Sequence, residues 1–266
     1  MIGILIGLVA VIITFLLKGV SPVILINLPS IFIVIVGSAG AVIASFGMDN
    51  FKKVPKTFML GSKPYKGNIV ATRVLLVDFA QRARQSGTLA LEGDVEKLDD
   101  PFLKRGLQMV IDGIEPEHVE EVLNLEVDGL KRRHADGHQL WGMWAGYAPT
   151  FGILGAVMGL IAVMAHLSEP EKLGAGIQVA FIATLLAVGL ANILFMPISV
   201  SLKGRTAKEV IEREMAITGI LAIQAGDNYR VVATKLDTFL TPAQLASIPE
   251  KGSGSGEAGS AAAEAA

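Results

Sequence analysis

The chain of 266 residues contains no cysteine, which excludes both a disulfide framework and a thiolate metal site. Its net charge of −2 argues against general binding to nucleic acid. The phosphate-binding pattern Gly-x-x-x-x-Gly-Lys-Ser/Thr does not occur, and no Ser-His-Asp arrangement or acid/base pair can be placed. We therefore expect neither an enzyme nor a bound cofactor.

Charge is also scarce, and it is missing from long stretches of the second half. Charged residues make up 18% of the chain and hydrophobic residues 52%, which is typical of a protein that lies partly in a membrane. One apolar run covers Gly142–Leu167, and the thirty residues between Lys172 and Lys203 contain no Asp, Glu, Lys or Arg. As a helix the second run is about 45 Å long, against a hydrocarbon core of about 30 Å. With the polar corner Ser168–Lys172 between them, the two runs predict a helical hairpin that crosses a bilayer twice.

Two further apolar runs lie near the start of the chain, at Met1–Leu17 and Ile31–Met48. The first has no basic residue before it and no cleavage signal after it, so we expect a retained span and not a removed signal peptide. The second carries several small residues, which let another helix approach closely in a membrane. These are Gly37, Ser38, Gly40, Ala44 and Ser45. The sequence thus predicts an all-α, polytopic membrane protein with four transmembrane helices and a cytoplasmic helical domain.

Basic residues set the orientation of the spans, because cytoplasmic connections carry the excess of Lys and Arg. The two connections on one side hold only Lys18 and Lys172. The flanks on the other side hold Lys52, Lys53, Lys56, Lys63, Lys66, Lys131, Arg132, Arg133, Lys203, Arg205 and Lys208. We therefore expect both termini and the long middle segment to be cytoplasmic.

Five segments follow from this division. They are residues 1–48 with transmembrane helices one and two, 49–140 as a cytoplasmic helical domain, 141–202 as the hairpin of helices three and four, 203–251 as cytoplasmic C-terminal helices, and 252–266 as a flexible tail. The tail is predicted from its composition of Gly, Ser, Ala and Glu.

Helix signals are clear in the predicted cytoplasmic segments. Helices are expected over 68–86 with Gly87 as its C-terminal cap, over 101–114, from Pro116 onward without a clear stop before Trp141, over 203–226, and from Pro242 with Thr241 as its cap. The missing stop indicates that the helix from Pro116 continues into the third span.

Two histidines, His134 and His138, stand four residues apart, the spacing of a two-point metal contact on a helix. No Glu or Cys lies in register with them, so a solvated helix face is the favoured interpretation. We expect no metal site.

No predicted span has an ionisable side chain at mid-membrane depth, although membrane ion transport commonly uses one. If the chain lines an ion path, a partner must therefore supply the group that takes up the ion. The polar or helix-breaking residues of the hairpin are few, namely Pro149, Thr150, Thr184, Asn192 and Pro197. A membrane proline removes one backbone hydrogen bond and loosens the helix, although packing kinks and a Thr184 bond to a carbonyl one turn back are simpler interpretations.

Four sequence features, taken in order, resemble one known family. Pro149-Thr-Phe-Gly-Ile-Leu-Gly-Ala-Val-Met-Gly159, followed by Ala183-Thr184 and then Pro197, is similar to the conserved hairpin of the motor protein A (MotA) family. Arg84-Gln-Ser-Gly-Thr-Leu-Ala-Leu-Glu92 resembles that family's charged cytoplasmic segment. The order of two spans, a loop of about ninety residues, two spans and a tail also fits this family. Its members are the larger subunits of bacterial flagellar stators.

The resemblance implies a role for each matching residue. Pro149 and Pro197 match the two membrane prolines linked to coupling ion flow to movement, and Thr184 matches the pore threonine. Arg84 and Glu92 match the charged pair that faces the rotor switch complex, whereas by themselves they would be a helix-capping arginine and a surface glutamate. A bacterial inner-membrane location is implied as well.

The resemblance also implies partners and an ion. Motor protein B would bring a single membrane helix with an aspartate, and five copies of this chain would surround two of that partner among membrane lipids. Sodium-driven members tend to have threonine where this chain has Ala156. Because the missing hydroxyl removes an oxygen ligand that Na⁺ prefers, we expect protons to be the coupling ion.

Two other functions stay open from the sequence. The first is an energy-transducing channel subunit of the ExbB/TolQ kind, although those proteins usually have three spans. The second is a non-conducting membrane scaffold or a permease, in which the prolines and small residues would serve helix packing alone.

Overall fold

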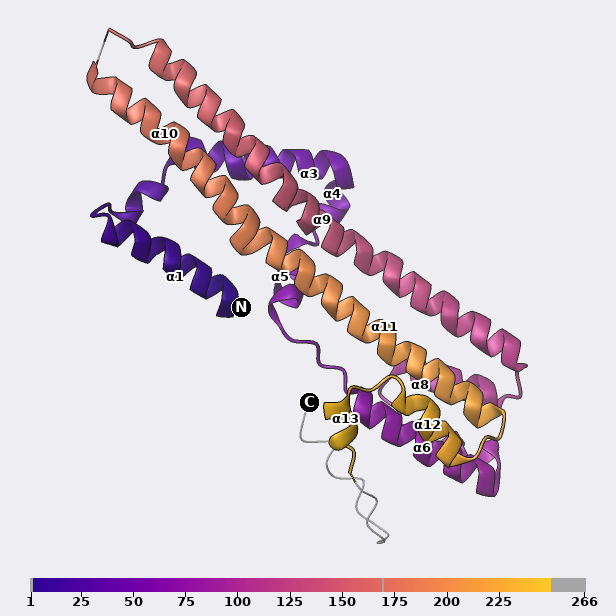
Figure 1. Ribbon diagram of the computed structural model, residues 1–266. Helices are drawn as coiled ribbons and strands as arrows, with labels where there is room; N and C mark the ends of the chain where they lie inside the picture. Colours follow the sequence, from indigo (N-terminus) through magenta and orange to yellow (C-terminus); the bar gives the residue numbers. More distant parts are fainter. Residues whose placement is uncertain (1, 169, 250–266) are drawn as a thin grey trace. The chain divides into compact units, whose positions relative to one another are not determined.

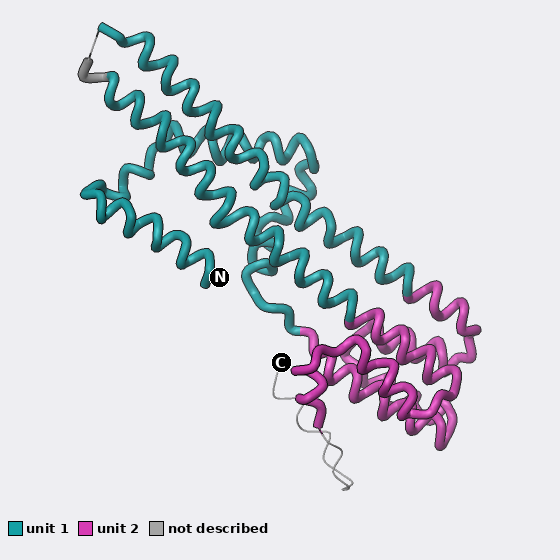
Figure 2. The backbone as a smooth tube through the Cα atoms, in the orientation of Figure 1, with its two compact units in different colours: residues 1–66, 124–211 teal, residues 67–123, 212–266 magenta. Residues whose placement is uncertain are grey.

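The computed structural model describes residues 2–168 and 170–249, and within them every regular element is a helix, which confirms the all-α prediction. The chain forms two compact units (Figure 2), of which unit 1 holds residues 1–66 and 124–211 and unit 2 holds 67–123 and 212–266. Each unit therefore combines segments far apart in the sequence. The predicted cytoplasmic segment 49–140 is divided between the units, because residues 49–66 and 124–140 pack with the apolar helices and only 67–123 belong to unit 2. Its side of the membrane stays a prediction.

Unit 1 contains the long apolar helices (Figure 1). Its first half holds α1 (Ile2–Leu17), η1 (Pro22–Leu25), α2 (Leu28–Ile31), η2 (Phe32–Gly37), α3 (Ser38–Phe46), α4 (Met48–Phe51) and α5 (Val54–Ser62). Its second half holds most of α9 (Pro116–Met164), α10 (Pro170–Gly189), η4 (Leu190–Phe195) and the start of α11 (Met196–Gln224). By length and composition, three of its helices could cross a membrane: Leu28–Phe46, the apolar end of α9, and the helix from Leu173 onward.

The first apolar helix is shorter than the other three. α1 has 16 residues, which gives about 24 Å at 1.5 Å per residue, less than a hydrocarbon core of about 30 Å. Four spans, with α1 as one of them, therefore stay a prediction.

The second predicted span begins three residues earlier than expected, at Leu28. Asn27 caps it, since the Asn27 side chain accepts a hydrogen bond from the Ser30 backbone N–H. Pro29 stands in the first turn, where its missing N–H costs nothing. The span ends at Gly47, whose φ of 77° is readily adopted only by glycine. We expected Pro29 to lie before the helix, whose predicted start was Ile31. In the structure Pro29 instead lies in the first turn of the helix.

The 49-residue helix α9 confirms that the helix from Pro116 continues into the third span, with Pro149 in its interior. The helix predicted over 203–226 likewise has no separate start, because α11 follows η4 directly and ends at Gln224. Pro197 weakens the helix but does not end it, so the apolar helix continues past Lys203.

Glycines bring the two arms of the predicted hairpin into contact. A Cβ on Gly152 would lie 3.2 Å from the Ala183 backbone oxygen, and one on Gly159 would lie 3.0 Å from the Ala180 Cβ. Such close helix packing is what small residues permit in a membrane. The predicted corner contains Glu169, which lies outside the described residues, and α10 begins immediately after it.

An aromatic cluster forms the core of unit 1 where α9 enters its apolar run. Trp141 and Trp144 stack with ring centroids 5.5 Å apart, and both rings contact Phe195 of η4. Phe58 of α5 packs on Trp141, and Phe51 of α4 packs on Trp144. The sequence analysis did not predict α4, which is a single helical turn, or α5, which has nine residues.

Unit 2 holds the remaining helices. They are α6 (Ile69–Ser86), η3 (Thr88–Leu91), α7 (Glu92–Val95), α8 (Pro101–Ile111), α12 (Tyr229–Asp237) and α13 (Pro242–Ala246), together with the start of α9 and the end of α11. Buried Leu76, Phe79, Leu107, Ile220 and Leu236 belong to its core. The expected start of α6, the Gly87 cap and the Thr241 capping box are confirmed. α8 ends three residues early because Gly113 adopts φ 73°, and the predicted tail 252–266 lies outside the described residues.

Candidate functional site: a proline hairpin and an exposed charged turn

Pro149 interrupts the hydrogen bonding of α9. Proline has no N–H, so the carbonyl of Ala145, one turn earlier, loses its helical donor. Ala145 is 5% exposed and Pro149 is half-buried, so this carbonyl lies inside the helix bundle. The neighbouring Thr150 hydroxyl donates to the Tyr147 carbonyl at 2.7 Å. The helix thus has a weak point close to its aromatic core.

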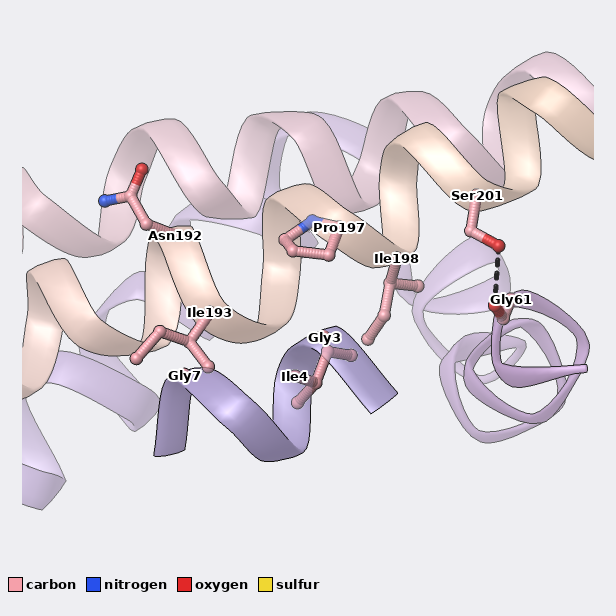
Figure 3. Close-up of a pocket in the computed structure, with 9 residues that line it drawn as sticks. All are labelled: Gly3, Ile4, Gly7, Gly61, Asn192, Ile193, Pro197, Ile198 and Ser201. Carbon is pink, nitrogen blue, oxygen red and sulfur yellow. Dashed lines mark hydrogen bonds between the residues drawn. The ribbon is translucent and has the colours of Figure 1, made fainter. Parts of the chain in front are cut away.

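Pro197 lies two residues after the π-helical turn η4. The π-turn alters the backbone hydrogen bonds of residues 190–195, and Pro197 has no N–H to donate to a carbonyl one turn earlier. The carbonyls of η4 therefore have fewer backbone donors. On one side Pro197 faces a cleft of about 340 Å³ (Figure 3). The cleft is lined by Gly3, Ile4 and Gly7 of α1, by Gly61 of α5, and by Asn192, Ile193, Ile198 and Ser201. Pro197 therefore has free volume beside it, into which the helix can move.

Thr184 lies on the α10 face that packs against α9. Its hydroxyl oxygen is 3.4 Å from the Ala180 carbonyl oxygen and 3.5 Å from the Gly152 carbonyl oxygen. Both separations are long for a hydrogen bond from a hydroxyl, so neither carbonyl holds the group firmly. Gly152 is one helical turn before Ala156, which is half-buried. The structure thus brings Thr184 close to the turn that carries Ala156, and leaves its hydroxyl available for another partner.

Arg84 and Glu92 lie at the two ends of one turn in unit 2. Arg84 is in the last turn of α6, and Glu92 begins α7, so each charge stands at the helix end that its sign favours. Gly87, with φ 82°, makes the change of direction, and buried Leu91 and Val95 anchor the turn. Both charged side chains are exposed, and within the described residues neither forms an ion pair. Two unpaired charges are thus presented to solvent on a fixed turn.

Arg82 fixes the shape of that turn. Its guanidinium pairs with Asp78 at 3.0 Å and with Asp94 at 2.5 Å, and it lies 4.9 Å from the centre of the Phe79 ring. The Asp94 contact joins α7 to α6 across twelve residues of sequence. Arg82 was expected only as a positive charge near the negative end of its helix, and its contact with Asp94 was not predicted, although an arginine and an aspartate on either side of a Gly turn are a recognisable signal.

The histidine pair contacts polar side chains of α11 in unit 1. The His134 Nδ1 is 3.1 Å from the Thr206 hydroxyl oxygen. Burial lowers the pKa of His138, and the nearby charges of Lys203 and His134 lower the pKa further. Within residues 2–168 and 170–249, no three His, Cys, Asp or Glu side chains gather as metal ligands. The geometry gives the pair a packing role between helices.

The chain is similar to one protein family and to several named proteins. Residues 94–215 match the model of the MotA/TolQ/ExbB proton channel family. The chain is 38% identical to motility protein A of Borreliella burgdorferi over 81% of its own length and 83% of the relative's. It is 37% identical to motility protein A of Bacillus subtilis, over 95% of its own length and 94% of the relative's.

Solved structures give the same result. The flagellar MotAB stator complex from Bacillus subtilis has a chain that is 37% identical, with a TM-score of 0.87 and coverage of 94% of this chain and 98% of that one. The MotAB structure from C. jejuni has a chain that is 29% identical, with a TM-score of 0.86 and coverage of 91% and 94%. The similarity therefore includes both compact units.

Proposed function

The chain belongs to the motility protein A family, within the MotA/TolQ/ExbB proton channel family, and we propose on this premise that it is the ion-conducting A subunit of a flagellar stator. The observation that carries the proposal is the similarity to a MotAB stator chain over 94% of this chain and 98% of that one. A partner of the B type would complete the complex. The ExbB/TolQ-like channel and the scaffold or permease have no comparable observation in their favour.

The hairpin of α9 and α10 would hold the ion path. Between Leu173 and Leu202 the chain has no Asp, Glu, Lys or Arg, so the carboxylate that takes up the ion would come from the membrane helix of the partner. Next to neutral helices a carboxylate loses solvation, which favours its protonated form. Its gain or loss of charge would thus change how strongly it interacts with the surrounding helices. Thr184, whose hydroxyl is only weakly held, would be a polar group close to that carboxylate.

Movement would follow from this change of charge. Protons from the periplasmic side would neutralise the partner's carboxylate, and their release to the cytoplasm would restore its charge. The helices around it would then prefer different positions in the two states, and they can bend at Pro149 and at Pro197 beside its cleft. We propose that five copies of this chain surround two partner helices and rotate about them in the bacterial inner membrane. Four passes with both termini cytoplasmic would place unit 2 on the rotor side.

The exposed charges of Arg84 and Glu92 would contact the rotor switch complex. Charged groups on a fixed turn recognise a partner by complementary charge without needing a large apolar interface. The ion pairs of Arg82 would keep both charges in position while force is transmitted.

The coupling ion is proposed to be the proton. Ala156 offers no oxygen ligand, and Na⁺ is held by oxygen atoms. We expect swimming speed to stay unchanged when sodium is replaced by potassium at fixed pH, and to fall when a protonophore removes the proton gradient. Speed tracked in single cells measures this effect. Swimming that slows in proportion to the sodium removed would contradict the assignment of the proton.

Co-purification tests the stator assignment itself. The tagged chain, extracted from its native membrane in mild detergent, should elute together with a single-span protein that has a membrane carboxylate, in a ratio of five to two. Native mass spectrometry measures both the ratio and the identity. A chain that elutes without such a partner and transports a solute when reconstituted alone would be a permease, and the proposal would be wrong.

A further inference from the structure

Two π-helical turns occur in the described part of unit 1, and both lie in apolar helices. η2 (Phe32–Gly37) belongs to the second apolar helix, and η4 (Leu190–Phe195) precedes Pro197. A π-turn inserts one residue into a helix and weakens its hydrogen bonding, and such turns are frequent at functional sites. The local geometry of each helix can therefore change at this point at low cost.

Trp144 of α9 is linked to the first of these turns through Ser38, the residue that directly follows η2. Its indole Nε1–H donates to the Ser38 hydroxyl oxygen at 2.9 Å. The same hydroxyl donates to the carbonyl of Val34, which lies inside η2. Ser38 has no exposed surface and Trp144 is 7% exposed, so both bonds are shielded from water. A shift of η2 that broke them would leave polar groups without partners in an apolar environment, which is costly.

The same tryptophan stacks on the second turn. Its ring lies 4.6 Å from the ring of Phe195, centroid to centroid, with an angle of 21° between the planes. Phe195 is the last residue of η4 and precedes Pro197 by two positions. Trp144 is also five residues before Pro149 on α9. One side chain thus stacks on η4, is linked to η2 through Ser38, and lies near both membrane prolines.

We propose that Trp144 is a positioning residue that makes the two π-turns change together, so that bending at Pro197 also moves the helix that contains Ser38. The inference rests on the proposed stator function and adds a coupling residue to it. The Trp144 ring is stacked on η4 and hydrogen-bonded to Ser38, whose hydroxyl in turn donates to the Val34 carbonyl of η2. The ring therefore cannot follow η4 without pulling on Ser38. The three apolar helices that contain Ser38, Trp144 and Phe195 therefore move as one group when the partner's carboxylate changes charge.

Trp141 provides a matched control on the same helix. It is also buried, at 3% exposed, and its Nε1–H also donates to a hydroxyl, that of Thr57, at 2.9 Å. Thr57 belongs to α5, however, and not to a π-turn. Both rings also contact Phe195, that of Trp141 at 5.8 Å and that of Trp144 at 4.6 Å. Trp141→Phe and Trp144→Phe therefore remove the same atoms and the same kind of bond, and they differ in the hydroxyl that loses its donor, which is Thr57 of α5 or Ser38 beside η2.

The experiment compares the two variants, each expressed with the partner in cells that lack the wild-type chain. We expect both complexes to assemble, and we expect Trp144→Phe to lower motor torque by about two- to tenfold relative to Trp141→Phe, as expected for the loss of one hydrogen bond. Ser38→Ala, a smaller change that removes the same acceptor, should give the same loss. Equal torque in Trp144→Phe, Ser38→Ala and Trp141→Phe would overturn the inference.

A fluorescence readout separates coupling from simple packing. In Trp141→Phe, Trp144 is the only tryptophan of this chain, and subtracting the spectrum of the Trp141→Phe/Trp144→Phe double variant removes any emission of the partner. We expect its emission maximum to differ between complexes whose partner has the membrane carboxylate and complexes in which an amide replaces it. Identical emission in the two complexes would overturn the coupling. If the wild-type chain and partner do not support swimming at all, the stator assignment fails instead.

Discussion

Arg84→Glu and Glu92→Lys should each stop swimming while the stator still assembles in the membrane. Both side chains are exposed and make no ion pair within the described residues, so their reversal breaks no salt bridge of unit 2. Each reversal does place the charge at the helix end that its sign disfavours, which changes the free energy of unfolding by only about 1 kcal/mol. At the rotor contact, however, the reversed charge would face a charge of the same sign, which raises the free energy of binding by several kcal/mol. The fraction of time for which the contact is occupied falls by more than about tenfold. Swimming speed, together with the amount of complex in the membrane, measures the effect.

A control with the same changes of charge tests whether the position matters. Glu120→Lys and Arg132→Glu alter exposed residues of α9 that lie outside the turn. We expect both control variants to swim normally. Loss of swimming in the controls as well would mean that the total charge matters and that the turn has no special role.

The double variant Arg84→Glu/Glu92→Arg gives a sharper test. The two side chains do not pair with each other, so exchanging their charges should not restore swimming. Recovery in the double variant would identify them as partners of each other and would place the rotor contact elsewhere. Recovery through a compensating change of charge in the rotor protein would support the proposed contact.

The sequence predicted most helices because their signals are local. Gly87 and Thr241 end or begin helices through their own backbone and side-chain chemistry, so their roles could be inferred from neighbouring residues alone. The absence of a stop signal was equally informative in α9. Because no helix-breaking residue lies between Pro116 and Trp141, the sequence predicted that the helix continues past Trp141. The two compact units could not be predicted in this way, because each combines distant segments.

The candidate site was predicted only where it resembled known motifs. Pro149, Thr184 and Pro197 were recognised by type and order, but the cleft beside Pro197 depends on Gly3 and Gly7, which are nearly two hundred residues away in the chain. The π-turns were not predicted, since no residue type marks an inserted residue within an apolar helix. The sequence analysis did not single out Trp144 and named Ser38 only as a small residue, whereas their bond across 106 residues gives them their importance.

Pro197→Leu should leave the complex assembled and at least as resistant to heat, while motor torque falls strongly. Leucine supplies the N–H that proline lacks, and a proline in a helix interior costs about 3 kcal/mol. Restoring the bond would favour the straight helix by the same amount, which shifts an equilibrium between straight and bent forms by about a hundredfold. The cleft of about 340 Å³ beside Pro197 has room for the larger side chain, so overpacking is not expected.

The combination of unchanged assembly and lost torque is what distinguishes coupling from packing. If Pro197 served packing alone, Pro197→Leu would lower the unfolding temperature of the purified complex and torque would fall with stability. Pro116→Leu is the matched control, because Pro116 stands in the first turn of α9, where no helical N–H is required. We expect this control to retain full torque. Full torque in Pro197→Leu would mean that the fourth predicted span works without bending at this residue. The hairpin would then need another hinge, and Pro149, which lies inside α9, is the remaining proline in a helix interior.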